Sequence, residues 1–116
     1  MQIKKKKSVN VLGVPYTITV TTEQDDPRLT DADGCCDDST REILVEDFKA
    51  HRQDPNSKAD LDVSFKKVLR HEIVHAFLSE SGLADNSDWA KNEEAVDWIA
   101  LQGPKIYKAW QEVGAL

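Results

Sequence analysis

Cysteine, histidine and long apolar runs are scarce in this 116-residue sequence. The two cysteines, Cys35 and Cys36, are adjacent, so a disulfide between them would be strained. Reduced thiols are typical of the cytoplasm, and the pair lacks the Cys-x-x-Cys spacing of a metal site. No apolar stretch approaches the roughly 20 residues of a membrane-spanning helix. The sequence therefore predicts a soluble cytoplasmic protein.

Positive charge is also in deficit, since 15 Lys and Arg face 21 Asp and Glu, a net charge of −6. An acidic surface argues against nucleic-acid binding, and the lysine run at residues 4–7 is typical of a solvated strand or tail. The N-terminal region contains Asn10, Pro15 and alternating threonines but no signal-peptide cleavage site. We therefore predict no nucleic-acid partner, no membrane partner, and strands near the N-terminus.

Internal repeats are absent, and the length predicts a single domain spanning residues 1–116. Three strands are predicted in the first half: VNVL, YTITVTT after a turn at residues 13–15, and REILVED. The acidic segment between the last two strands includes DADGCCDD. It does not fit an EF-hand calcium loop, because placing Gly34 at position 6 puts Leu29 at position 1. This segment therefore predicts an acidic turn.

Helices are predicted in the second half. The first begins between residues 57 and 62 and ends at Ser81, and its apolar residues cover much of the circumference, which predicts burial on several sides. A second helix begins at residue 87 or 88 and ends where Gly103 and Pro104 begin a third. The predicted fold class is α+β: a small antiparallel or mixed sheet of about three strands packed on the long helix, followed by two C-terminal helices.

The stretch LRHEIVH in the first predicted helix places His71, Glu72 and His75 within an apolar run. At 3.6 residues per turn, the two histidines project from one face and can bind one ion, and Glu72 lies about 100° further round. H-E-x-x-H on a helix is the metal-binding pattern of zinc peptidases. Surface polar residues of an amphipathic helix are the alternative. On a buried helix, however, unsatisfied polar groups are costly, and a metal would satisfy all three.

A third protein ligand would leave the fourth position of zinc for water. The second predicted helix offers Glu93 and Glu94 in KNEEAVDW, and helical periodicity does not distinguish them, because each belongs to a regular stripe. A thiolate from Cys35 or Cys36 is a less favoured candidate. Spacing alone therefore leaves the third ligand open.

The combination of HEIVH with NEEAVD resembles the gluzincin zinc peptidases, in which a glutamate ligand is followed four positions later by an acidic residue. Glu93 and Asp97 have this spacing, whereas Glu94 and Trp98 do not. The resemblance thus implies that Glu93 binds the metal and that Asp97 hydrogen-bonds a metal-binding histidine and fixes its tautomer.

More narrowly, HEIVHAFLSESGL with EEAVDWIALQGPKI is similar to small metallopeptidases encoded by phages and prophages, distantly related to the ImmA/IrrE group, over residues 35–113. The resemblance implies a zincin-like fold and a zinc metalloendopeptidase of peptides or proteins in the bacterial host cytoplasm. One Zn²⁺ per chain would be held by His71, His75 and Glu93, with Glu72 as the general base. Larger gluzincins add an oxyanion-stabilising His or Tyr, for which this chain offers His51, Tyr16, Tyr107 and Arg70.

Two alternatives to the peptidase stay open. One is a non-catalytic, zinc-stabilised binding or virion-associated module, since small domains gain folding free energy from a structural metal; the other is a metal-free interaction protein. Glu72 favours the enzyme, because a structural zinc site needs no carboxylate beside a ligand. In the enzyme, the third predicted strand would align an extended peptide by backbone pairing if it lies at a sheet edge.

Overall fold

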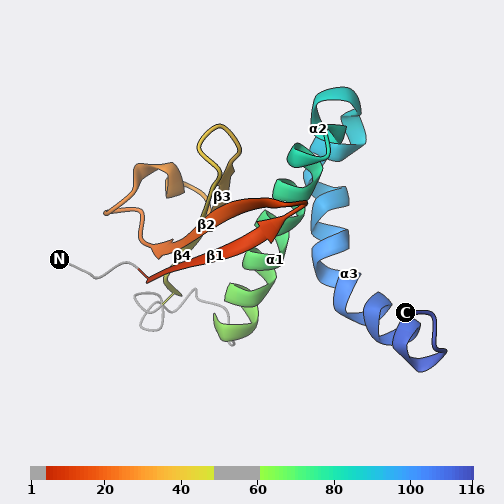
Figure 1. Cartoon of the computed structure of the whole chain (residues 1–116). Coiled ribbons are helices and arrows are strands. Elements are labelled where there is room, and N and C mark those ends of the chain that lie inside the picture. Colours follow the sequence, from red (N-terminus) through yellow and green to blue (C-terminus); the bar gives the residue numbers. More distant parts are fainter. Residues whose placement is uncertain (1–4, 49–60) are drawn as a thin grey trace.

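A computed structural model describes residues 5–48 and 61–116 of the chain (Figure 1). The strands are β1 (Lys5–Val11), β2 (Val14–Thr21), β3 (Gly34–Asp37) and β4 (Glu42–Glu46), with the 3-10 helix η1 (Pro27–Leu29) between β2 and β3. The helices that follow are α1 (Leu61–Glu80), α2 (Leu83–Asn86), the 3-10 helix η3 (Asp88–Lys91) and α3 (Glu93–Glu112). The predicted α+β class, with strands first and helices after, is confirmed.

The four strands form one mixed sheet in the order β1-β2-β4-β3, rather than a sheet of about three strands. β1 and β2 form an antiparallel hairpin around Leu12 and Gly13. Both turn residues have positive φ, 52° and 90°, as a two-residue type I′ hairpin turn requires. β4 pairs in parallel with β2 and antiparallel with β3.

The unpredicted strand is β3, whose sequence GCCD lies in the segment predicted to be an acidic turn. Glycine and aspartate are depleted in strands, so composition favours a loop here. The segment forms a strand because it pairs with β4, where Cys35 lies opposite Leu44 and Cys36 lies opposite Ile43. β4 is consequently an interior strand, and the expectation that it could be a sheet edge is wrong; β3 is the edge.

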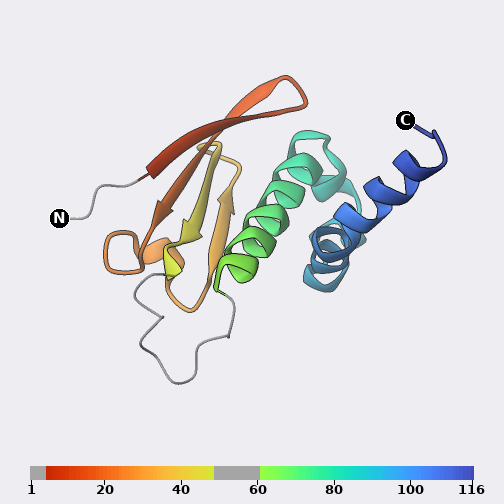
Figure 2. The same ribbon diagram turned by 90° about the horizontal axis from the view of Figure 1, so that it is seen from below.

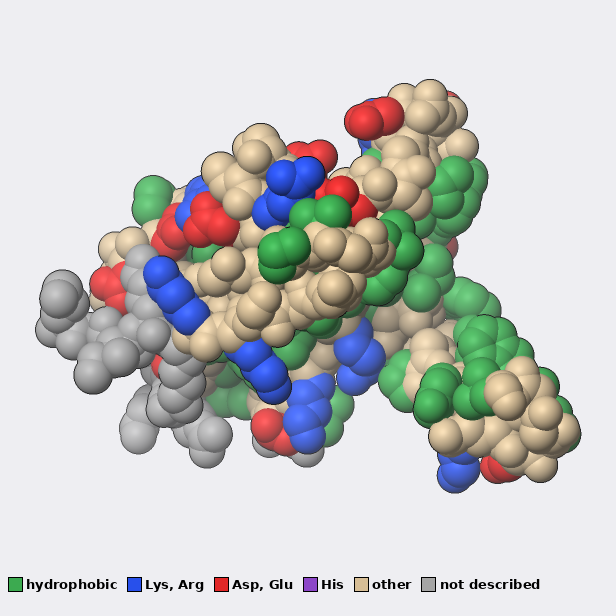
Figure 3. Space-filling model, in the orientation of Figure 1, with side chains coloured by type: hydrophobic (Ala, Val, Ile, Leu, Met, Phe, Trp, Pro, Cys, Tyr) green, Lys and Arg blue, Asp and Glu red, His purple; other side chains and the backbone are tan. Residues whose placement is uncertain are grey.

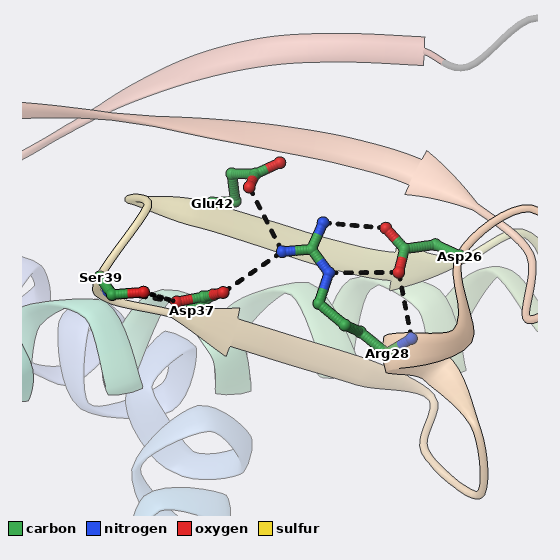
Figure 4. A network of polar contacts seen from close by, with 5 residues as sticks. All are labelled: Asp26, Arg28, Asp37, Ser39 and Glu42. Atoms are coloured by element: carbon green, nitrogen blue, oxygen red, sulfur yellow. Dashed lines mark hydrogen bonds and ion pairs between the residues drawn. The ribbon is translucent and has the colours of Figure 1, made fainter.

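Arg28 of η1 forms ion pairs with several carboxylates of the acidic segment around β3 (Figure 4). Its guanidinium forms ion pairs with Asp26 at 2.9 Å and with both Asp37 and Glu42 at 3.3 Å. Asp37 also accepts a hydrogen bond from the hydroxyl of Ser39. One guanidinium thus pairs with three carboxylates of this acidic segment, which are ordered without a calcium loop.

Helix α1 lies between the sheet and α3 (Figure 2). On one side Phe65 and Ile73 pack against a core of sheet residues that includes Ile43. On another side Leu78 packs with Val96 of α3. The predicted burial of this helix on several sides is confirmed, as is its end, because α1 stops at Glu80. Its start was predicted between residues 57 and 62, of which 57–60 lie outside the described residues; α1 begins at Leu61.

The predicted break at Gly103 and Pro104 is wrong, because α3 continues through Pro104 to Glu112. In a regular helix the amide of residue 104 donates to the carbonyl of Ala100, but proline has no N–H. Arg70 of α1 replaces that donor, with its Nε donating to the Ala100 oxygen at 2.7 Å. A tertiary hydrogen bond thus satisfies the group that the proline leaves free.

We expect Arg70→Met to lower the free energy of unfolding by about 1–3 kcal/mol, because the Ala100 carbonyl would lose its donor inside the α1–α3 interface. In a Pro104→Ala background the new amide can donate to that carbonyl, so the same substitution should cost less, by at least about 0.5 kcal/mol. Urea denaturation of the four proteins measures the difference. Equal costs in the two backgrounds would contradict the compensation.

The C-terminal half of α3 projects away from α1, and Figure 3 shows hydrophobic side chains on this lobe. The buried residues of α3, Val96 and Ala100, both lie in its N-terminal half. Tyr107 and Trp110 are about half exposed, at 53% and 50%.

None of the helices in the described ranges has the length and apolarity needed to cross a membrane.

Candidate metal centre

His71 and His75 meet Glu93 where α1 and α3 come together. The Nε2 atoms of the two histidines lie 3.2 Å apart. Glu93 contacts both rings, its Oε2 lying 2.9 Å from His71 Nε2 and its Oε1 2.9 Å from His75 Nε2. Two helices that are separated in the sequence therefore bring three donor groups to one point.

This triangle of donors has the size that zinc requires. Ligands at about 2.05 Å from a tetrahedral zinc are about 3.3 Å from one another; the two Nε2 atoms are 3.2 Å apart, and each lies 2.9 Å from a different oxygen of Glu93. Imidazole nitrogens and a carboxylate oxygen are also the donor types that zinc binds. The residues present thus fit a zinc ion in both spacing and chemistry.

The start of α3 places Glu93 at the histidines. Asn92 caps the helix, its side chain accepting a hydrogen bond from the amide of Ala95, so Glu93 is the first helical residue. Burial raises the pKa of Glu93, but hydrogen bonds and the charges of the two histidines outweigh it and hold the pKa below its usual value. Glu94 makes no ion pair with either histidine among the described residues.

Asp97 lies one turn after Glu93 and faces the other nitrogen of His71. Its Oδ1 is 3.4 Å from His71 Nδ1, and its Oδ2 is 3.5 Å from the ammonium of Lys67. A carboxylate at Nδ1 favours the tautomer that keeps its proton there and leaves Nε2 as an acceptor. Lys67 adds a contact that the sequence did not reveal.

Glu72 is the most buried carboxylate of the group, with 6% of its surface exposed. A Glu72 oxygen and one ring nitrogen from each of His71 and His75 lie within 4.8 Å of one another. Burial raises the pKa of Glu72 to about 7, the charge of His71 opposes this rise, and the charge of Glu93 adds to it. We assign Glu93 rather than Glu72 as the third donor, because Glu93 contacts both rings at 2.9 Å.

Edge strand β3 passes directly over Glu72. A Cβ atom on Gly34 would lie 2.8 Å from Glu72 Cγ and 2.7 Å from Val68 Cγ1, closer than packed carbon atoms approach. Glycine is therefore required at this position, since only a residue without Cβ allows the strand to come so near. A single glycine in an acidic segment gave no sequence signal of this contact.

Gly34→Ala should lower the free energy of unfolding by about 1–3 kcal/mol, because the added methyl group overpacks the contact between β3 and α1. Gly103→Ala is the matched control: no atom lies within 4 Å of its added Cβ, and alanine should stabilise the α3 interior by about 0.5–1 kcal/mol. Urea denaturation of both variants would show opposite signs. Equal effects would contradict the close approach at Gly34.

Two cavities flank the donor triangle and share Glu72, His75 and Glu93 in their linings. One, of about 380 Å³, also touches residues 32–34 before and in β3, and Lys67. The other, of about 350 Å³, extends past the end of β3 to α2 and η3. We refer to the two together as the β3 groove; it continues on both sides of the candidate metal site.

The residues considered as oxyanion donors lie in other settings. Tyr16 is fully buried and donates its hydroxyl to Glu80 at 2.8 Å, and Arg70 donates to the Ala100 carbonyl. Tyr107 is on the projecting half of α3, and His51 lies outside the described residues. The structure thus brings none of the described three into the lining of the β3 groove.

Cys35 and Cys36 are free thiols on β3. Cys36 lines one cavity of the groove beside Glu72. Burial, followed by the charge of Glu72, raises the pKa of the Cys36 thiol to about 12, and burial also raises that of Cys35. These surroundings favour the neutral thiols over the thiolates.

Comparisons with known proteins identify no relative of this chain. The chain matches no protein-family model. No curated protein and no solved structure is significantly similar to it.

Proposed function

We propose that this protein is a zinc-dependent endopeptidase with a zincin-like fold. The observation that carries the proposal is the triangle of His71, His75 and Glu93, beside which Glu72 is buried in an open groove. A structural zinc site normally closes its fourth position, whereas here a carboxylate and a groove adjoin the donors. The motif resemblance to phage and prophage metallopeptidases of the gluzincin type supports the same class.

Each residue then has a defined task. His71, His75 and Glu93 would hold the ion, which when bound lowers the pKa of a water molecule to about 7 and polarises a carbonyl group. The carboxylate of Glu72 accepts a proton from the attacking water and delivers it to the amide nitrogen that leaves. Asp97 holds His71 in the orientation in which Nε2 faces the ion.

The open groove supports cleavage within a chain. Cavities on both sides of the donor triangle give room for residues before and after the cleaved bond. Edge strand β3 runs along the groove and can pair with an extended peptide through its free backbone groups. An exopeptidase would instead need one side closed around a chain terminus.

The test is metal content followed by cleavage. Protein purified without chelators or a metal-binding tag should contain about one zinc per chain by elemental analysis, and His75→Ala should lose it. Mass spectrometry of a peptide library incubated with the wild type should then show internal cuts that the variant does not make. Absence of metal after zinc is added at neutral pH would overturn the proposal, as would a zinc-loaded protein that cuts no peptide.

A further inference from the structure

The charged side chains along the β3 groove are mostly acidic. On the side that includes Gly34, the ammonium of Lys67 forms an ion pair with Asp97, with 3.5 Å between Nζ and Oδ2. Asp33 lines the same cavity, is exposed, and forms no ion pair with another described residue. Apart from Glu72 and Glu93, which line both cavities, this side therefore presents one uncompensated negative charge.

The opposite side of the groove is also acidic. Asp38, after β3, and Asp85, in α2, both line it, and Lys91 of η3 is the one Lys or Arg among the described residues that do so. None of the three forms an ion pair with another described residue. Two carboxylates against one ammonium leave this side with one net negative charge as well.

A buried polar group between the two sides also points to a ligand. Glu72 is 6% exposed, lines both cavities, and makes no hydrogen bond or ion pair with another described residue. Because Glu72 lines both cavities, a molecule that occupies the groove can supply the polar contacts that this carboxylate lacks.

We propose that the β3 groove selects extended peptide segments with Lys or Arg on both sides of the bond that lies at Glu72. The inference rests on the proposed function for the position of that bond. Ammonium and guanidinium groups would pair with Asp33 on one side and with Asp38 and Asp85 on the other. The net charge of −6 also steers basic segments towards the protein.

Binding to zinc-loaded Glu72→Gln protein tests the selection separately from cleavage. The probes are two short blocked peptides of Ala, Thr and Val that differ only in carrying Lys or Glu on each side of the central bond. Each exposed pairing changes affinity about two- to fivefold, so two pairings should make the Lys peptide bind about 4- to 25-fold more tightly by fluorescence anisotropy. The difference should shrink at high salt, where surface charges are screened.

Charge variants locate the selection. Asp38→Asn with Asp85→Asn leaves Lys91 unopposed and should remove most of the preference for the Lys peptide. Glu23→Gln with Glu112→Gln removes the same charge at exposed positions outside the groove lining and should keep the preference. Charge-selective binding that responds in this way supports the inference even if the wild type cuts neither peptide, a result that would count only against the peptidase. Equal binding of the two peptides, no binding of either, or equal kcat/KM for both would overturn it.

Discussion

Glu72→Gln is expected to lower kcat for peptide hydrolysis by about 10²- to 10⁴-fold while leaving zinc content unchanged. The amide has nearly the same shape as the carboxylate, so the packing under Gly34 is kept. An amide cannot accept the proton of the attacking water. The three proposed zinc ligands of the variant, His71, His75 and Glu93, are unchanged. Steady-state kinetics with a peptide from the library, together with elemental analysis, measure both quantities.

Stability provides the control for this variant. A carboxylate that is 6% exposed and has a pKa raised by burial destabilises the folded state when it is ionised. Glutamine removes that charge, so the variant should be at least as stable as the wild type in urea. Loss of activity through unfolding is thereby separable from loss of the general base, and an unchanged kcat would remove Glu72 from that role.

Glu93→Ala is expected to weaken zinc binding by more than about 100-fold. Loss of a residue that only orients a metal ligand costs about 10- to 100-fold in affinity, and Glu93 contacts the Nε2 atoms of both histidines directly. Competition with a chromogenic chelator measures the dissociation constant. Asp97→Asn should fall within the smaller range, because Asp97 contacts only the distal nitrogen of His71.

Glu94→Ala is the matched control, since Glu94 is the adjacent residue in the same helical turn and is exposed. Its zinc affinity should equal that of the wild type within about twofold, because its carboxylate ion-pairs with neither histidine. A larger loss in Glu94→Ala than in Glu93→Ala would show that α3 presents the other glutamate to the metal.

The pairing of the two histidines was predictable because it depends on local helical spacing. His71 and His75 lie one turn apart on any α-helix, and the motif resemblance distinguished Glu93 from Glu94 through the spacing to Asp97. The structure brings Glu93 to both histidines and Asp97 to the distal nitrogen of His71. Short-range regularity thus accounts for the histidine pair, whereas the packing of α3 on α1 brings Glu93 and Asp97 to it.

The features that sequence did not predict depend on partners distant in the chain. β3 forms from GCCD because β4 offers pairing and because Gly34 fits against Glu72. α3 continues past Pro104, and Arg70, thirty positions before Ala100, supplies the missing donor. Local propensity favours a turn in the first case and a helix break in the second, and tertiary contacts override both.

The uneven attachment of α3 has a consequence for its amide protons. The contacts that hold this helix to α1, at Glu93, Asp97 and Ala100, all lie in its N-terminal half, and the half beyond Gly103 has no buried residue. Opening of that distal half exposes little apolar surface, so its amides should exchange with solvent deuterium through local fraying. The proximal half can open only by releasing the candidate metal ligand. The two halves of this continuous helix should therefore differ in their rates of amide exchange. Metal binding should slow exchange only in the N-terminal half.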